Sequence, residues 1–270
     1  MLDHVTVFRD GVLALAEPLD GASLLDVGTG DGLIGLEALE RVGPDGEVIF
    51  SDISPALLER AREAAGAAAD DGRARFVQSS AESLAEIDDA SIDVATTRSV
   101  LIYVADKPAA FAALHRVLRP GGRISLFEPI NRLMFPEPPD RLWGYDVGSI
   151  VALADKLKAS YSALKDPASE TMMDFDEHDL VRFAEIAGFE RVHLECHIDI
   201  EPSAHMGALD LATLLQMAPN PHAPTLGEVL DDALDAPERE RFMAEFGRIM
   251  RDEEPVKRSA VAYLAARKRD

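Results

Sequence analysis

Short apolar runs alternate with segments of helical spacing along the first half of the chain. The apolar runs predict buried strands at residues 23–27, 47–50, 74–78, 92–96 and 124–127. The segments between them predict helices at residues 33–41, 55–69 and 108–118. Strands separated by helices of this length pair in parallel through right-handed crossovers. The pattern therefore predicts an α/β fold with a doubly wound sheet.

The alternation breaks after the fifth predicted strand. Residues 129–148 hold four prolines and favour neither helix nor strand. Further helices are predicted at residues 151–164 and 176–187, and two last strands at residues 191–200 and 259–266. We therefore expect one domain over residues 1–270, with a seven-stranded, mostly parallel, Rossmann-like sheet. Segments 129–173 and 201–258 fall outside the sheet pattern, and we expect them to form helical cap insertions over a substrate site.

Charge is the outlying feature of the composition. The chain has 27 Lys and Arg against 49 Asp and Glu, which gives a net charge of −22. Such a surface repels phosphate backbones and anionic lipids, so we expect neither nucleic acid nor membrane as a partner. The single cysteine, Cys196, excludes internal disulfides, and its strand-like surroundings predict a buried position. The sequence shows no basic leader and no long apolar stretch, so we expect a cytoplasmic protein.

A glycine-rich turn, Leu-Asp-Val-Gly-Thr-Gly-Asp-Gly over residues 25–32, follows the first predicted strand. Gly28 and Gly30 allow a sharp turn and a close approach of a ligand to the backbone. The dinucleotide pattern G-x-G-x-x-G would require its third glycine where Leu33 stands, but the chain has it one residue earlier, at Gly32. No Gly-Lys-Ser/Thr follows, so the turn is not a P-loop either.

Two aspartates flank this turn in the predicted sheet. Asp52 follows the second strand, where a carboxylate can bind both ribose hydroxyls of an adenosine cofactor or can cap the helix that starts near Pro55. The nearby glycine turn favours the ribose contact. Asp26 lies inside the first strand and needs a partner, either loop amides or a cationic ligand group, because a buried unpaired carboxylate is costly. An acid before the glycines suits a cofactor with an ammonium and a sulfonium better than NAD with its pyrophosphate.

Four features together resemble the class I S-adenosylmethionine-dependent methyltransferases, nearest the branch of quinone-biosynthesis and small-molecule enzymes. They are residues 25–32, Asp52, residues 76–82 (FVQSSAE) and residues 115–123 (HRVLRPGGR), in the order and spacing of that family. The resemblance covers residues 23–128. It implies S-adenosylmethionine as the cofactor and S-adenosylhomocysteine as the product. No metal is expected, because no carboxylates cluster with Asn or His at the predicted strand ends.

The resemblance assigns the methionine part of the cofactor to the first and fourth strands. Gly28 and Gly30 would pass the methionine portion, and Asp26 would lie near its amino end. Arg98, just past the fourth predicted strand, would lie beside the same portion.

The adenosine part would lie against the second and third strands. By the resemblance, Asp52 would hold the ribose and Ile53 would pack on the adenine. Ser80 and Ala81 would line the adenine edge, Ala81 through its backbone amide. Relatives often have an acid where Ser80 stands, and Glu82 or water could replace its contact to the adenine amino group.

Candidates on the acceptor side follow the later strands and the first insertion. Tyr103 is a possible hydrogen-bond donor or base, and its alternative is a half-buried ring in a loop. Glu128 ends the fifth strand and could line the pocket or anchor a loop. Trp143 and Tyr145 could wall an apolar substrate or pack the cap against the protein.

Other polar residues of the second half favour structural roles. His193 and His197 share one strand face, but metal binding would need a third ligand, so we expect packing or surface roles. His205 and His222 lie in the second insertion, from which they could reach over the site. The leucines of residues 209–215 predict a core-facing helix.

The expected reaction is an in-line transfer of a methyl group from positive sulfur to oxygen, nitrogen or carbon of a small molecule or peptide. The protein would mainly supply positioning and desolvation. Arsenite as acceptor would need several cysteines, which the chain lacks. The alternatives are a non-catalytic regulatory protein that keeps the cofactor pocket and a nucleotide-dependent oxidoreductase. A homodimer is the oligomeric state we consider.

Overall fold

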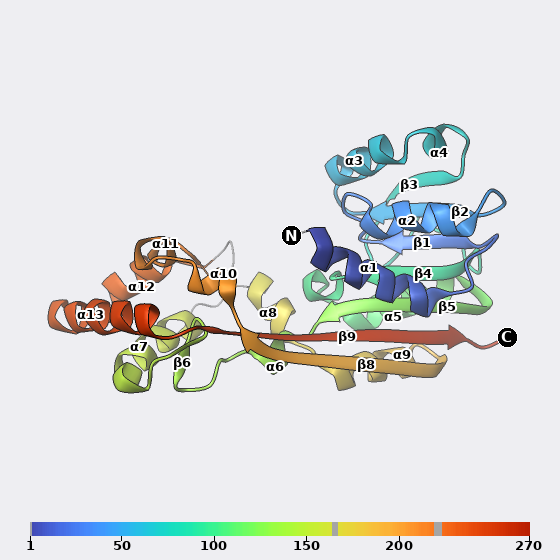
Figure 1. Ribbon diagram of the computed structural model, residues 1–270. Coiled ribbons are helices and arrows are strands. Elements are labelled where there is room, and N and C mark those ends of the chain that lie inside the picture. Colours follow the sequence, from blue (N-terminus) through green and yellow to red (C-terminus); the bar gives the residue numbers. More distant parts are fainter. Residues whose placement is uncertain (1, 164–166, 219–222) are drawn as a thin grey trace. The chain divides into compact units, whose positions relative to one another are not determined.

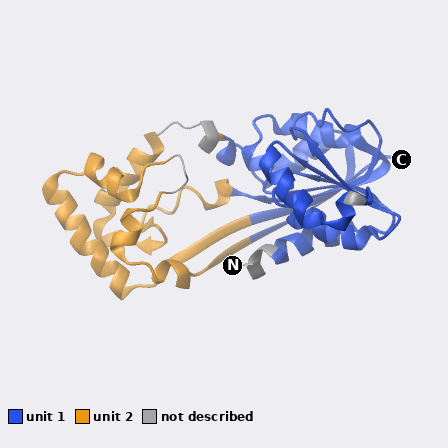
Figure 2. Ribbon diagram, turned by 90° about the horizontal axis from the view of Figure 1, so that it is seen from above, with its two compact units in different colours: residues 1–130, 171–197, 261–270 blue, residues 131–170, 198–260 orange. Residues whose placement is uncertain are grey.

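The computed structural model describes residues 2–163, 167–218 and 223–270 (Figure 1). The chain divides into two compact units, which Figure 2 shows in different colours. Unit 1 comprises Met1–Ile130, Thr171–His197 and Val261–Asp270, and unit 2 comprises Asn131–Glu170 and Ile198–Ala260. No helix in the described part of the chain is both long enough and apolar enough to cross a membrane.

A seven-stranded sheet forms the centre of unit 1. Its strands are β1 (Ser23–Val27), β2 (Glu47–Asp52), β3 (Ala74–Gln78), β4 (Ile92–Arg98), β5 (Leu118–Pro129), β8 (Phe189–Pro202) and β9 (Val256–Lys268), the last two of which also contribute residues to unit 2. They lie in the order β3-β2-β1-β4-β5-β9-β8. The pairs from β3 to β5 are parallel, and β9 runs antiparallel to β5. The predicted seven-stranded, mostly parallel sheet is confirmed.

Helices flank this sheet. They are α1 (Leu2–Ala16), α2 (Leu33–Val42), α3 (Pro55–Ala65), α4 (Ala67–Asp70), the 3-10 helix η1 (Leu101–Tyr103), α5 (Lys107–Val117) and α9 (Glu177–Ile186). Helix α8 (Pro167–Met173) has residues in both units. The helix predicted at residues 55–69 is two helices, because Gly66 takes φ +53 between them. Asp176 caps α9 in a capping box, as the sequence predicts.

Helix α1 is a feature that the sequence pattern did not predict. A glycine at position 11 lowers the helix propensity of this segment. The structure requires that glycine, because a Cβ there would lie 2.6 Å from Cε1 of Tyr263 on β9. Val12, Leu13 and Ala16 are fully buried in the core of unit 1. Tertiary packing, and not local propensity, therefore accounts for this helix.

Close packing of α2 on the sheet positions the turn that precedes it. All five residues of β1 are buried. A Cβ at Gly35 of α2 would lie 2.4 Å from Cε1 of Phe50 on β2. Glycine at this position therefore lets α2 pack more closely on β2 than a residue with a side chain would allow. Phe50 in turn stacks on Phe76 of β3, with 4.9 Å between ring centroids. These contacts fix where α2 begins, next to the carboxyl end of β1.

The two insertions form unit 2 together, with one shared core. Its elements are α6 (Asn131–Met134), β6 (Arg141–Leu142), β7 (Tyr145–Asp146), the 3-10 helix η2 (Gly148–Ile150), α7 (Val151–Ala163), α10 (Ala204–Gly207), α11 (Leu211–Leu215), α12 (Leu226–Ala233) and α13 (Ala236–Asp252). Residues of both insertions, Tyr145 and Phe246 among them, pack in this core with no exposed surface. Unit 2 comprises residues 131–170 and 198–260, where the sequence predicts insertions at residues 129–173 and 201–258. That unit 2 covers a substrate site stays a prediction.

Candidate cofactor site

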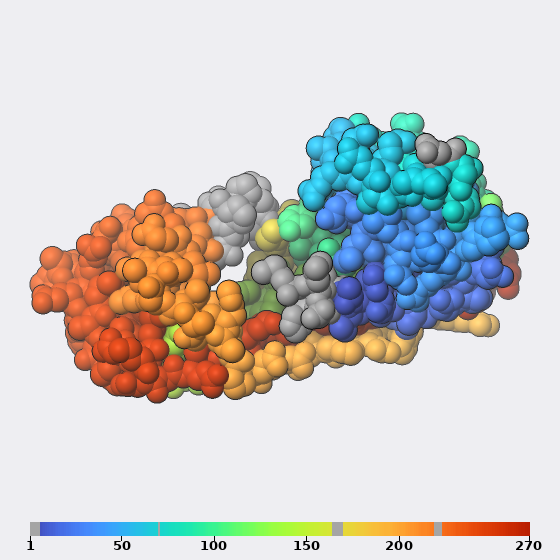
Figure 3. All heavy atoms as spheres, turned by 45° about the horizontal axis from the view of Figure 1, so that its top comes forward, coloured from blue at the N-terminus to red at the C-terminus, as the bar shows by residue number. Residues whose placement is uncertain are grey.

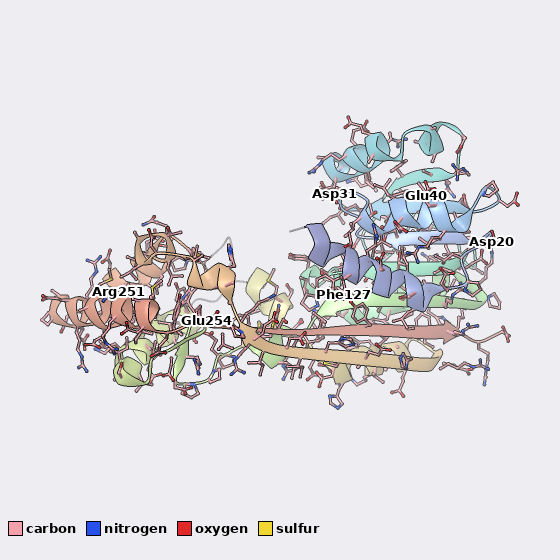
Figure 4. The ribbon with its side chains drawn as sticks, in the orientation of Figure 1. Asp20, Asp31, Glu40, Phe127, Arg251 and Glu254 are labelled. Atoms are coloured by element: carbon pink, nitrogen blue, oxygen red, sulfur yellow. The ribbon has the colours of Figure 1, made fainter. Side chains whose placement is uncertain are left out.

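The predicted site residues of unit 1 gather at the carboxyl ends of the central strands. Parallel strands that point the same way bring the residues after them to one edge of the sheet, where ligands bind in such folds. In Figure 4, Asp31 marks the glycine turn at this end of β1, and Asp20 marks the opposite end. The register sets Val27 beside both Ser51 and Thr97, so the ends of β1, β2 and β4 coincide.

Asp26, which precedes the glycine turn, is held by hydrogen bonds from three other residues. Its carboxylate accepts hydrogen bonds from Thr29 Oγ1 at 2.6 Å, Thr96 Oγ1 at 3.0 Å and the backbone N–H of Gly35 at 3.0 Å. Burial raises the pKa of Asp26 to about 6, although these bonds and the charge of Arg98 act in the opposite direction. Of the two partners that the sequence left open, the structure supplies the protein donors. Asp26 therefore shapes the turn.

Asp52 connects the same turn to β2. Its Oδ2 accepts a hydrogen bond from the backbone N–H of Gly30, and its Oδ1 accepts one from that of Ser54, both at 2.9 Å. Helix α3 is capped by Ser54, whose Oγ accepts from the N–H of Leu57, so the alternative of Asp52 as the N-cap is wrong. A carboxylate has about four acceptor sites, so two bonds leave capacity for ribose hydroxyls.

The two central glycines of the turn have different surroundings. Gly28 and Gly30 both take the left-handed conformation, with φ +64 and +59. A Cβ on Gly28 would lie 2.3 Å from Cγ2 of Val100, so this glycine makes room for a protein side chain. A Cβ on Gly30 would have no atom of the described residues within 4 Å. Gly30 is thus the open position of the turn, whereas Gly28 also makes room for Val100; that both glycines pass the methionine portion stays a prediction.

The adenosine side of the edge carries an exposed apolar side chain. Ile53, directly after β2, is 70% exposed, and its carbonyl accepts a hydrogen bond from Gln78 Nε2 at 3.1 Å. Ser80 and Ala81 are half-buried in the turn after β3. Glu82 Oε1 accepts from the backbone N–H groups of the Ala105–Asp106 loop at 3.1 and 2.9 Å. Oε1 of this carboxylate is therefore engaged in holding that loop, and a contact of Glu82 to the adenine stays a prediction.

Glu128 at the end of β5 is fully buried. Its Oε1 accepts hydrogen bonds from the backbone N–H groups of Val100 at 2.9 Å and Leu101 at 3.0 Å, and from Thr97 Oγ1 at 3.3 Å. Its Oε2 is buried and has no hydrogen-bond partner in the described part of the chain. Burial raises the pKa of Glu128 to about 7. The loop-anchoring role is thus present through Oε1, while Oε2 is enclosed in the protein without a described partner.

The loop that Glu128 anchors carries Tyr103. This tyrosine ends η1 and is 67% exposed, so the alternative of a half-buried ring is wrong. Arg98 is the last residue of β4 and does not lie beyond it. Lys107, which the sequence reasoning missed, is 2% exposed, and its Nζ bonds the carbonyls of Val104 and Thr171 and the carboxylate of Asp174. Nothing in the sequence around Lys107 signalled a buried cation.

The acceptor candidates of the first insertion belong to the core of unit 2. Tyr145 has no exposed surface, its ring packs edge-on against Phe246, and its hydroxyl donates to the carbonyl of Met206 at 3.2 Å. In this structure it offers no surface to a substrate, which corrects its assignment and supports the packing alternative. Trp143 is half-buried, and its backbone N–H donates to Glu137 Oε2 at 2.8 Å.

The remaining polar candidates also divide. His193 and His197 both contact the carboxylate of Glu195 on an exposed strand face, as a surface role predicts. Cys196 is exposed, contrary to the prediction of burial. His205 is exposed on unit 2, and His222 lies outside the described residues.

The sheet order and the glycine and aspartate geometry define a Rossmann-like protein that binds a nucleoside cofactor.

Comparisons with known proteins agree with this class. A family model described as "Methyltransferase domain" matches residues 18–165. Nocamycin O-methyltransferase of Saccharothrix syringae is 33% identical over 201 residues, which cover 72% of this chain and 69% of that protein. The ubiquinone/menaquinone biosynthesis C-methyltransferase UbiE of Idiomarina loihiensis is 31% identical, with coverages of 64% and 68%. An arsenite methyltransferase of Halobacterium salinarum is 30% identical, but the match spans only 48% of that protein's length.

Solved structures extend the likeness of the fold to nearly the whole chain. An arsenic(III) S-adenosylmethionine methyltransferase from Chlamydomonas reinhardtii aligns with a TM-score of 0.53 at 20% identity, over 94% of this chain and 66% of that one. A Haemonchus contortus phospholethanolamine N-methyltransferase, in complex with S-adenosylhomocysteine, aligns with a TM-score of 0.54 at 14% identity, over 97% and 52%. The chain belongs to the class I S-adenosylmethionine-dependent methyltransferases.

Proposed function

We propose that the carboxyl edge of unit 1 holds S-adenosylmethionine for methyl transfer to a low-molecular-weight organic acceptor. The observation that carries the assignment is Gly30. It has open space where a Cβ would stand, a backbone N–H held by Asp52, and a turn shaped by Asp26. A ligand can therefore approach this backbone closely, next to an acid suited to ribose hydroxyls.

The other residues of the edge complete the proposed cofactor contacts. The exposed face of Ile53 suits the adenine ring, because a large apolar side chain left in water gains from being covered. Ser80 and Ala81 would line the edge of that ring, and Gly28 and Arg98 would flank the methionine portion.

When bound, the cofactor supplies a methyl group activated by positive sulfur. The chain's own residues then have to orient the acceptor and exclude water, which are effects of positioning and desolvation. An acceptor that arrives protonated also needs a base, and a pKa near the working pH suits that task. We propose that Glu128 takes this proton through its unpartnered Oε2, which requires the acceptor to displace the atoms that enclose Oε2 in this structure. The exposed hydroxyl of Tyr103 would donate a hydrogen bond to the acceptor.

The acceptor class rests on charge and on the named relatives. Nocamycin and the quinones that appear in the relatives' names are small organic molecules, and the net charge of −22 disfavours nucleic acid. The single, exposed Cys196 does not supply the several thiols that arsenite would need. A peptide acceptor remains part of the proposal. The fold alone does not decide the chemistry, since the [4+2]-cyclase SpnF aligns with a TM-score of 0.54 at 18% identity.

The test compares two glycines that share a positive φ and open surroundings. Gly30 and Gly66 have φ +59 and +53, and a Cβ on either would meet no atom of the described residues within 4 Å. Gly30→Val and Gly66→Val both place a β-branched residue at positive φ and should each lose stability, by at least about 1–2 kcal/mol. Calorimetric titration with S-adenosylhomocysteine should show affinity reduced about 100-fold or more for Gly30→Val and unchanged for Gly66→Val. Equal affinities would place the ligand elsewhere, and a wild-type preference for NADH would reject the cofactor.

A further inference from the structure

Strand β8 is the edge of the seven-stranded sheet. It stands at the end of the strand order, so in the described part of the chain only one of its two edges is paired, with β9. In Figure 3 the light-orange atoms of β8 form the lower rim of unit 1. Every residue of β8 from Glu195 onward is exposed, including Ile198 at 57% and Ile200 at 58%. A long exposed edge of this kind is a template for pairing with another strand.

The residues of β8 alternate strictly over its regular stretch, which starts after Arg191, the residue with φ +53. The even positions are apolar: Val192, Leu194, Cys196, Ile198 and Ile200. The odd positions are charged or imidazole side chains: His193, Glu195, His197, Asp199 and Glu201. Successive side chains of a strand point to opposite faces, so one face is apolar and the other polar.

Two antiparallel copies of β8 match each other when Cys196 of one copy lies opposite Cys196 of the other. Residues at equal distances on either side of Cys196 would lie opposite each other if two copies paired antiparallel around a two-fold axis. Val192 then faces Ile200 and Leu194 faces Ile198 on the apolar side. On the polar side, His193 faces Asp199 and Glu195 faces His197. Each imidazole then lies directly opposite a carboxylate that can accept its N–H, and no two carboxylates lie directly opposite each other.

Neighbouring registers lack this match. An axis at Glu195 would set the two Glu195 carboxylates against each other, and an axis at His197 would set Glu195 against Asp199. An axis between two residues would bring apolar side chains opposite charged ones. Like charges directly opposite on a sheet are destabilising. The sequence of β8 thus favours the axis at Cys196 over these neighbouring registers.

We propose that β8 pairs antiparallel with β8 of a second copy of this chain, with the two-fold axis at Cys196, to give a homodimer with one continuous sheet. Main-chain hydrogen bonds supply affinity in such strand addition, and side-chain pairs supply the register. A second copy fits better than an unrelated strand, because complementarity about a two-fold axis serves only an identical partner. The net charge of −22 on each chain opposes the association of two copies, so the contact depends on the local match of side chains along β8.

A cross-linking experiment tests the axis. Residues directly opposite in an antiparallel pair have Cα atoms about 4.5–5.5 Å apart, within the range of a disulfide. Residue 198 of one copy would lie four positions, about 13 Å, from residue 198 of the other. Mild oxidation of the full chain with diamide should therefore join wild-type dimers through Cys196. The variant Cys196→Ser with Ile198→Cys carries an exposed thiol on the same strand face and should not cross-link.

A charge exchange tests the register and guards against misfolding. His197→Glu sets the introduced carboxylate against Glu195 of the other copy, twice per dimer, and should raise the dissociation constant roughly 10-fold or more. Adding Glu195→Lys to that variant recreates an opposite-charge pair and should restore dimerisation in sedimentation velocity. A wild-type chain that stays monomeric at high micromolar concentration overturns the proposal. Equal cross-linking of the two thiols, or a double variant no better than His197→Glu, overturns the register.

Discussion

The two units of this protein are built on different requirements. The carboxyl edge of unit 1 depends on particular backbone conformations and particular donors and acceptors, as at Gly30, Asp26 and Asp52. Unit 2 depends on the shape and volume of apolar side chains, with Phe242 stacked on Phe246 in its core. Other apolar residues of similar volume can satisfy the second requirement, but few residues satisfy the first. The difference explains why the sequence motifs that resemble the methyltransferases, at residues 25–32, 52, 76–82 and 115–123, all lie in unit 1.

The largest expected effect is on unit 2. Phe246→Ala removes a fully buried ring and should lower the free energy of unfolding by about 3–5 kcal/mol. Trp143, the single tryptophan, lies in this unit, so denaturation followed by its fluorescence measures the loss. Phe135→Ala, at a half-exposed ring of the same unit, is the control and should cost far less. Affinity for S-adenosylhomocysteine should stay unchanged, and a large drop would contradict the separation of roles.

The next effect concerns the buried acid of unit 1. The pKa of Glu128 is raised from 4.5 to about 7, so the folded protein binds this proton more tightly than the unfolded chain. The stability that this confers is complete below about pH 4.5 and is lost as the pH rises to about 7. Relative to that of Glu128→Gln, the free energy of unfolding of the wild type should therefore fall by up to about 3 kcal/mol between pH 4.5 and 8. Unfolding curves at both pH values measure it, and a constant difference would refute the burial argument.

A smaller effect is expected at the end of β2. Asp52→Ala removes the acceptor for the Gly30 N–H together with the proposed ribose contact, and should weaken cofactor binding by about 1–3 kcal/mol. Ser54→Ala, which removes only the cap of α3, is the control and should reduce stability without changing cofactor affinity. Calorimetry on both variants separates the two roles of this segment. Equal affinities for wild type and Asp52→Ala would remove the ribose assignment.

The smallest expected effect is at Tyr103. Tyr103→Phe deletes an exposed hydroxyl and leaves the ring, so stability and cofactor affinity should not change. Loss of one hydrogen bond to the acceptor should slow turnover by about 0.5–1.5 kcal/mol, roughly 2- to 10-fold. The measurement is the rate of methyl transfer over a range of pH, once an acceptor is found. A rate that matches the wild type at every pH would assign Tyr103 no part in the reaction.

The sequence by itself predicted the strands and most helices of unit 1, because their hydrophobic periodicity is local. It also predicted the glycine turn and Asp52, because positive φ and a strand-end acid restrict residue choice. It did not predict α1, because Gly11 lowers the helix propensity of that segment. Glycine is required there because the ring of Tyr263 on β9 lies where a Cβ would stand. It also misplaced Cys196, since an apolar run does not tell an edge strand from a central one.

Only the tertiary structure decided which groups share one environment. The donors to Asp26 come from the turn, from α2 and from β4, 70 residues away along the chain. Gly28 leaves room for the side chain of Val100, and Glu128 accepts a hydrogen bond from the loop that carries Tyr103. Two insertions far apart in the sequence closed around one core. Local sequence determines conformation, whereas burial and pairing depend on residues that the fold brings together from distant parts of the chain.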